Sequence, residues 1–100
     1  MRSLNLARLD LASIRLVVLC AETGSLSAAT RESHCTLSAG SQRLSALEQA
    51  LGRRLFVRDY RGMQPTDAGE LVARYGRSIL AQIEQMHSLV TAASPSPIHD

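Results

Sequence analysis

The stretch TLSAGSQRLSALEQALG, residues 36–52, decides the fold expected for this chain. Its apolar positions and one glycine recur at helical spacing and predict the inner stripe of a helix: Leu37, Gly40, Leu44, Leu47 and Leu51. Thr36 suits the N-cap of this helix, and Gly52 suits its C-terminal stop.

The opposite side of this expected helix carries short polar side chains with almost no charge: Ser38, Ser41, Gln42, Ser45 and Gln49. A helix that only faces water normally carries Glu and Lys in i, i+4 pairs. Short hydroxyl and amide side chains instead allow another surface to approach closely. We therefore expect this face to contact a partner.

Two helices are expected before this stretch. Apolar residues between Asp10 and Glu22 follow the i, i+3, i+4 rule, with Asp10 as N-cap and Gly24 as the stop. A short helix fits residues 27–33, capped by Ser27, and its inward residues are small: Ala29, Thr30 and Ser33. A break at residues 34–35 separates it from the next helix, and His34 is expected to be a partly buried structural residue.

A small hairpin is expected after this stretch. The β-prone run 55–58 and the run 63–65 flank a glycine-containing turn at 59–62. Pro65 restricts the second run to an edge position. This hairpin would display Arg58 and Arg61.

The last expected helix is long. Thr66 caps it, Asp67 and Glu70 occupy its first turn, and it runs to about Thr91 before the Ser-Pro repeats at 94–97. At 1.5 Å per residue it spans roughly 35 Å, more than is needed to cover one face of a three-helix unit. Part of its apolar seam is therefore expected to meet a second chain: Val72, Tyr75, Ile79, Ile83, Met86 and Val90.

Composition excludes several classes of protein. The 100 residues, 45% hydrophobic and 20% charged, suit one soluble domain and exclude a fibrous or wholly disordered chain. No apolar run approaches the ~18 residues of a membrane span. We expect a cytoplasmic protein with no membrane contact.

Charge is concentrated in the middle of the chain. All eleven basic residues are arginines, and residues 27–61 hold six of them against three acidic residues. Guanidinium groups grip phosphate oxygens in a bidentate way, although a solvated face with surface ion pairs is an equally good interpretation of charge alone.

Catalytic and metal-binding patterns are not found. The sequence has no Ser/His/Asp grouping, phosphate loop or zinc spacing, so no enzyme activity, metal or cofactor is expected. Cys20 and Cys35 are interpreted as buried structural thiols.

This order of elements is that of a winged helix-turn-helix. From about Leu9 to Met86 the sequence also resembles the N-terminal DNA-binding domain of LysR-type transcriptional regulators. The matching stretches are 21–29, Ser41, Leu44, Leu47-Glu48, Leu51-Gly52, Leu55-Phe56-x-Arg58, Pro65-Thr66-x-Ala68-Gly69 and Arg77-x-Ile79-Leu80.

The resemblance implies a mainly α fold, a winged helix-turn-helix with a three-helix core and a short β-hairpin wing, over residues 1–65. A linker or dimerisation helix would follow over 66–93, and a Ser/Pro tail or interdomain linker over 94–100. The implied function is that of a bacterial, nucleoid-associated regulator that binds an inverted-repeat operator in duplex DNA as a homodimer. Its recognition helix, about 36–51, would enter the major groove.

The residues implied to face DNA lie on the second and third helices and on the wing: Ser27, Arg31, Thr36, Leu37, Ser38, Ser41, Gln42, Ser45, Arg58 and Arg61. The seam of the last helix would form the dimer interface. A small-molecule effector would bind only through the family's C-terminal domain, which is not in this chain. Whether the chain is a fragment or a stand-alone reader stays open.

Four positions depart from the family pattern. Leu37-Ser38-Ala39-Gly40-Ser41 stands where the family usually has Gln-Pro-Ala-Leu/Val-Ser, and Gln42 replaces a frequent arginine. Leu37 cannot donate to a base acceptor, and it stays open whether its side chain lies against a thymine methyl or in the core. Gly40 is expected to cost about 1 kcal/mol in helix propensity plus lost packing. Ser33 replaces a buried leucine. These changes motivate an alternative: a winged-helix protein-interaction module with lost or weak DNA binding.

Overall fold

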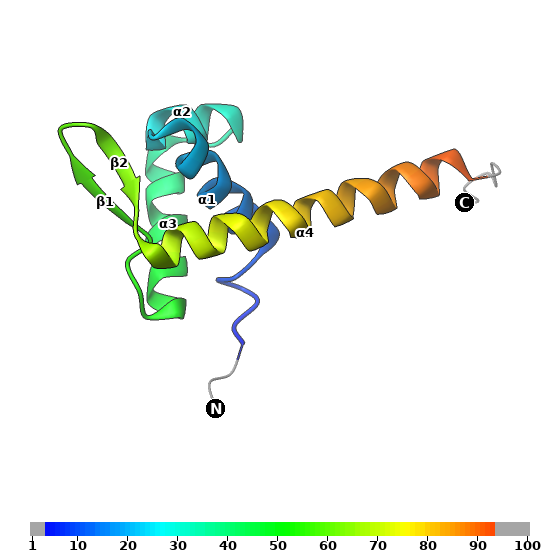
Figure 1. The fold of residues 1–100 in the computed structure, drawn as a ribbon, viewed down its shortest axis with the longest axis horizontal. Coiled ribbons are helices and arrows are strands. Elements are labelled where there is room, and N and C mark those ends of the chain that lie inside the picture. The colour runs from blue at the N-terminus through cyan, green and yellow to red at the C-terminus, as the bar shows by residue number, and fades with distance from the viewer. Residues whose placement is uncertain (1–3, 94–100) are drawn as a thin grey trace.

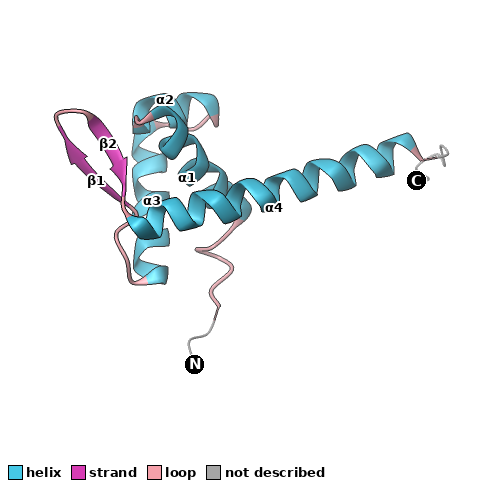
Figure 2. Ribbon diagram, viewed as in Figure 1, coloured by secondary structure: helices cyan, strands magenta, loops and turns pink. Residues whose placement is uncertain are grey.

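The computed structural model describes residues 4–93, so the expected tail at 94–100 lies outside the described residues. In chain order the elements are α1 (Leu11–Thr23), α2 (Leu26–Glu32), α3 (Leu37–Leu51), β1 (Phe56–Asp59), β2 (Gly62–Pro65) and α4 (Asp67–Ala92). The hairpin projects from one side of the helical core, and α4 runs across the core and beyond it (Figures 1 and 2). The expected mainly α winged-helix fold is confirmed. No helix in this part of the chain has the length and apolarity that crossing a membrane requires.

Local capping forms α1 as expected. The Asp10 carboxylate accepts a hydrogen bond of 2.8 Å from the backbone N–H of Ser13, and Gly24 ends the helix at φ 70°. The hydrogen bonds from Ser13, with a contribution from the Arg43 guanidinium, lower the pKa of Asp10 below its usual value.

The predicted start of α2 was wrong. Ser25 is the N-cap, and its hydroxyl accepts from the N–H of Ala28 at 3.1 Å, while Ser27 lies exposed in the first turn. The reason is Leu26, which is only 6% exposed and belongs to the core. Helix formation from residue 26 turns this leucine inward.

The core lies between α1, α3 and the entry to the hairpin. Its most deeply buried large side chains are Leu16, Leu47, Leu55, Val17 and Cys20. Burial raises the pKa of the Cys20 thiol to about 11, so this group stays protonated at neutral pH. Cys20 is thus the buried thiol that was expected.

The inner stripe of α3 is shorter than predicted. Gly40, Leu44 and Leu47 are buried, but Leu37 is 51% exposed. Leu37 is the first residue of the helix, where the chain arrives along the surface and both neighbours, Thr36 and Ser38, are also exposed.

Gly40 does not leave the packing defect that was expected. A Cβ atom at this position would overlap the Cγ2 methyl of Thr30, and it would lie 3.7 Å from the Sγ of Cys35. The methyl group of α2 therefore already fills the space of the missing side chain. The prediction of lost packing at Gly40 was therefore wrong. The prediction that glycine lowers the helix propensity at this position is not affected.

The turn between α2 and α3 is more open than predicted. His34 is exposed and adopts a left-handed backbone at φ 57°, so it is not the partly buried residue expected. Cys35 is only half-buried, and neither it nor Cys20 forms a disulfide. The backbone N–H of Cys35 donates to the Thr30 carbonyl at 3.0 Å, which closes the turn.

Hydrogen bonds near both strands help to hold the hairpin against the core, together with the buried side chains of Phe56 and Met63. The N–H of Met63 donates to the Gly24 carbonyl at 3.0 Å, the N–H of Leu55 donates to the Glu48 carboxylate at 2.7 Å, and the Thr66 hydroxyl donates to the Arg54 carbonyl at 2.7 Å. The strands are antiparallel, with Phe56 opposite Pro65 and Asp59 opposite Gly62. The wing is therefore anchored to the α1–α2 turn, to α3 and to the start of α4.

The first turns of α4 pack against the core through small residues. Gly69, Ala73 and Gly76 are buried, and a Cβ atom at Gly76 would lie 2.8 Å from the Cγ2 of Ile14. From residue 84 onward every described side chain of α4 is exposed. These outer turns of α4 (84–92) project away from the core (Figure 1).

Candidate nucleic-acid interface

A groove lies where the start of α2, the exposed side of α3 and the wing meet. One hollow of about 590 Å³ includes Ser27, Leu37, Ser41 and Arg58 in its lining. A second, of about 350 Å³, shares Ser41 and Arg58 and adds Ser45. We call the two hollows together the α3–wing groove. It brings together five of the residues that the sequence predicted to face DNA.

The exposed side of α3 matches the polar face that the sequence predicted. Ser38, Ser41, Gln42 and Ser45 are all exposed. Thr36 is exposed too, and its hydroxyl oxygen caps the helix by accepting from the N–H of Ala39 at 3.0 Å. The free N–H groups of a helix N-terminus attract phosphate, so this turn of α3 offers both hydroxyl groups and a positive dipole end.

Ser27 and Arg31 lie one turn apart on α2. Both are exposed, and Ser27 lines the α3–wing groove whereas Arg31 does not. No carboxylate of the described residues lies within 4 Å of the Arg31 guanidinium. Arg31 is therefore available to an external anion beside the groove.

The two wing arginines are in different environments. Arg58 lines both hollows and has no ion-pair partner in the described part of the chain. Arg61 forms an ion pair with Asp59, Nη2 to Oδ2 at 2.7 Å, and its backbone N–H donates to the same carboxylate at 2.8 Å. These hydrogen bonds lower the pKa of Asp59 and raise that of Arg61.

Surface ion pairs account for half of the central arginine cluster. Arg43 pairs with Asp10 at 3.6 Å, Arg54 pairs with Glu48 at 3.8 Å, and Arg61 pairs with Asp59. Within residues 4–93, no such partner is found for Arg31, Arg53 or Arg58. The positive charge left for a ligand is therefore near α2 and the wing, beside the groove.

A second open surface lies on α4. Of the predicted seam, Tyr75, Ile79, Met86 and Val90 are exposed, whereas Val72 and Ile83 are half-buried. Sequence reasoning missed Leu71 and Leu89, because a seam of one residue per turn is narrower than the exposed face. We call the exposed set the apolar α4 face, 38% to 67% exposed: Leu71, Tyr75, Ile79, Met86, Leu89 and Val90.

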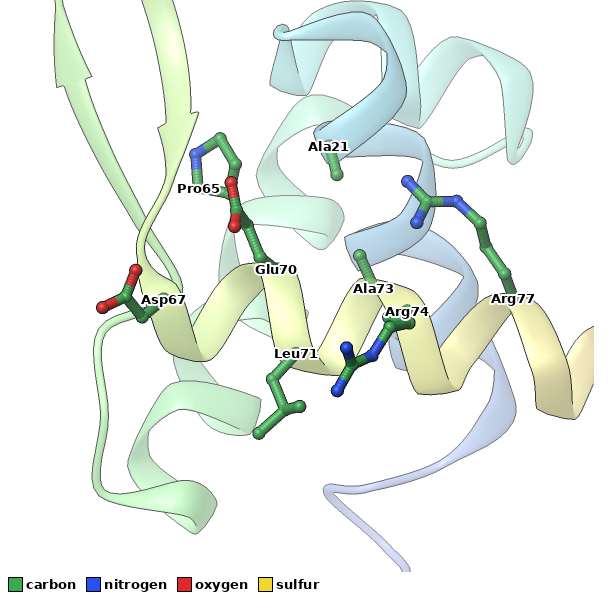
Figure 3. Close-up of a pocket in the computed structure, with 8 residues that line it drawn as sticks. All are labelled: Ala21, Pro65, Asp67, Glu70, Leu71, Ala73, Arg74 and Arg77. Atoms are coloured by element: carbon green, nitrogen blue, oxygen red, sulfur yellow. The ribbon is translucent and has the colours of Figure 1, made fainter.

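A hollow of about 580 Å³ runs along the first turns of α4. Figure 3 shows Ala73 and Arg77 on the side that faces Ala21 of α1, and Leu71 on the other side of the helix. The Arg77 guanidinium lies 3.4 Å from the Glu22 carboxylate, which ties α4 to α1. Acidic and basic groups mix in the lining, which contains none of the residues predicted to face DNA.

Comparisons with known proteins agree with this geometry. The family model described as "Bacterial regulatory helix-turn-helix protein, lysR family" matches residues 11–70. The nitrogen assimilation regulatory protein Nac of Escherichia coli is 38% identical over 72 residues, 72% of this chain and 24% of that protein. An HTH-type transcriptional regulator in the ibpB-leuC intergenic region of Azotobacter vinelandii is 42% identical over 76 residues, 76% of this chain and 53% of that protein. This chain thus spans less than two thirds of either relative.

A solved structure supports the likeness in three dimensions. The DNA-binding domain of CbnR, in a complex with DNA, matches 86% of this chain and 99% of its own, with a TM-score of 0.75 and 27% identity. That DNA-binding domain and this chain therefore share one fold over most of the length of each.

Proposed function

This chain belongs to the LysR family of bacterial regulatory helix-turn-helix proteins, and from that premise we propose that it reads an inverted-repeat operator as a homodimer. The observation that carries the proposal is the α3–wing groove. The hydroxyl-rich side of α3 lies there on one surface with Arg58, for which the described residues provide no ion-pair partner.

In the proposed complex α3 lies in the major groove and supplies base readout. Hydroxyl and amide groups donate to and accept from base edges there, where each base pair presents a distinct pattern. Ser38, Ser41, Gln42 and Ser45 carry such groups and are exposed. Thr36, at the N-cap, contacts a phosphate that the helix dipole favours.

Arginines around the groove supply the sequence-independent part of the affinity. Arg58 and Arg61 contact the backbone or the minor groove from the wing, and Arg31 with Ser27 contacts phosphates from α2. Such contacts release counterions, so the affinity falls steeply with salt. Arg58 contributes more than Arg61, because Asp59 competes for the Arg61 guanidinium.

The homodimer forms through the apolar α4 face. Within residues 4–93 the outer turns of α4 bury none of their side chains, and a second copy provides a matching apolar surface. Two-fold symmetry then presents two equivalent α3 helices, which suits an inverted repeat. The small-molecule effector would act through a C-terminal domain outside this chain, and the regulator would work on the nucleoid in the cytoplasm.

Selection from a randomised duplex pool, at low and at moderate salt, tests the proposal. We expect an enriched inverted repeat whose binding weakens as salt rises. Binding without enrichment would contradict base readout by α3 and leave only phosphate contacts. No binding at either salt concentration would favour the interaction module that the departures at Leu37, Gly40 and Gln42 suggest.

A further inference from the structure

Leu37 is an exposed apolar residue on the otherwise polar surface that is proposed to contact DNA. It is 51% exposed and lines the α3–wing groove beside Ser41. It is the one large exposed hydrophobic side chain of α3, a helix that the structure describes in full. Every other exposed side chain named on this side of α3 carries a hydroxyl or an amide.

The chemistry of leucine limits what it can contact in the major groove. Its side chain neither donates nor accepts a hydrogen bond, so a polar base edge buried against it loses water without replacement. The C5-methyl group of thymine is the apolar feature of the major-groove edge. 5-Methylcytosine carries the same methyl group at the same ring position.

We propose that Leu37 makes this protein select a C5-methylated pyrimidine, thymine or 5-methylcytosine, at one base pair of each half-site. This inference rests on the proposed function, because it requires the first turn of α3 to lie in the major groove. Ser41, on the same hollow, reads a neighbouring base pair by hydrogen bonding. The selectivity has an attractive part, burial of the methyl, and a repulsive part, the unpaired polar edge of any other base.

The size of the effect follows from one buried methyl group. Burial of a single CH₂-sized group corresponds to about fourfold in affinity. Because both half-sites of a symmetric dimer contribute, removal of the methyl from both corresponds to about fifteenfold. This effect is well within the range of a binding titration.

The test uses the operator enriched from the random pool. Each thymine is replaced in turn by uracil, symmetrically in both half-sites, which removes the C5-methyl and leaves the hydrogen-bonding groups unchanged. Binding is measured for the parent chain, for Leu37→Ala and for Leu11→Ala. Leu11 is a matched control, because it is also the first residue of a helix and is 49% exposed.

We expect one thymine position at which uracil weakens binding of the parent about fifteenfold. The same replacement should leave the affinity of Leu37→Ala unchanged, and Leu11→Ala should behave like the parent. Cytosine and 5-methylcytosine at that position distinguish the two sources of the methyl group. Tighter binding of 5-methylcytosine than of cytosine adds methylated DNA as a ligand, and equal binding assigns the selection to thymine.

Two results would overturn the inference. Either no thymine position is sensitive to uracil in the parent chain, or the sensitivity persists in Leu37→Ala. In both cases the enriched operator still binds, so the proposed function survives. If no duplex is enriched in the first place, the proposed function fails and this inference fails with it.

Discussion

α3 leaves one face exposed and the outer turns of α4 are exposed on all sides, and the apolar side of those turns has the opposite chemistry to the exposed face of α3. The open face of α3 carries serines and glutamines, whereas the outer turns of α4 expose Met86, Leu89 and Val90. Polar side chains on α3 are satisfied by water until a partner offers matching hydrogen bonds. Burial of the apolar side chains of α4 against a matching apolar surface lowers the free energy of the system. One face therefore suits selective binding, and the other suits a permanent partner.

The inner and outer turns of α4 show the same contrast within one helix. Gly69, Ala73 and Gly76 let the helix approach the core closely, and they bury little side-chain surface of their own. The larger exposed apolar residues of α4 lie on a different side, beginning with Leu71 in the same turns and ending with Val90 in the outer turns. The helix thus has one side shaped for its own core and another side that stays exposed, which is the side proposed to meet a second chain.

The largest effect is expected when charge is placed on the apolar α4 face. The double substitution Met86→Glu and Leu89→Glu should dissociate the dimer and lower affinity for an inverted repeat on the order of 100-fold or more, because two linked half-sites gain from avidity. Sedimentation equilibrium and a binding titration measure the two effects. Ser88→Glu, on the polar side of the same turns, is the control and should leave both unchanged. A dimer that persists in the double variant would place the interface elsewhere.

The buried side of α3 is tested by Gly40→Ala. The new Cβ would overlap the Thr30 methyl, so we expect the free energy of unfolding to fall by about 1–3 kcal/mol in urea denaturation. Thr30→Ser removes that methyl and retains the hydroxyl that donates to the Ser27 carbonyl at 3.1 Å, so the double variant should recover most of the loss. A Gly40→Ala chain as stable as the parent would show that Thr30 moves aside at little cost.

The two wing arginines test how much an ion pair within the chain reduces a contribution to DNA affinity. Arg58→Ala should weaken DNA binding about tenfold for each half-site at low salt and lower the salt slope by about one phosphate contact for each half-site, while Arg61→Ala should have a smaller effect. Titrations at several salt concentrations measure both. Equal losses of affinity in the two variants would mean that the ion pair with Asp59 does not reduce the contribution of Arg61 to DNA binding.

The Arg61 ion pair also predicts a flat pH response. Hydrogen bonds from Arg61 lower the pKa of Asp59, so the pair is present above the usual carboxylate range and is lost only as pH falls through the lowered pKa. The difference between the two arginine variants should therefore stay constant from about pH 6 to about pH 8. If the difference in DNA affinity between the two variants changed with pH across this range, a group other than Asp59 would have to cause it.

The smallest expected effect concerns one hydroxyl of α3. Ser41→Ala should weaken binding to the enriched operator about fivefold for each half-site and leave binding to random duplexes unchanged, because one hydrogen bond to a base edge contributes about 1 kcal/mol. Competition titrations with the two kinds of DNA measure the ratio. Ser78→Ala, exposed on α4, is the matched control. An equal loss on random DNA would make Ser41 a phosphate contact.

The order of the helices, the N-caps of α1, α3 and α4, and much of the two open faces could be predicted from the sequence, whereas the N-cap of α2 could not. Asp10, Thr36 and Thr66 cap the helices that they were predicted to cap, and Gly24 and Gly52 end theirs in left-handed conformations. Periodicity and capping act between residues a few positions apart, so they can be recognised without the fold. The family resemblance also came from short motifs, and it is confirmed over residues 11–70.

Which side chains are exposed and able to contact a ligand depends on the tertiary structure. Whether Leu37 is core or surface depends on what covers the first turn of α3, and whether Gly40 leaves a void depends on a methyl group of Thr30 in another helix. Arg58 and Arg61 both lie close to Asp59 in the sequence, yet among the described residues only Arg61 forms an ion pair. These outcomes depend on contacts between segments that the chain brings together only on folding, and local patterns carry no record of such contacts.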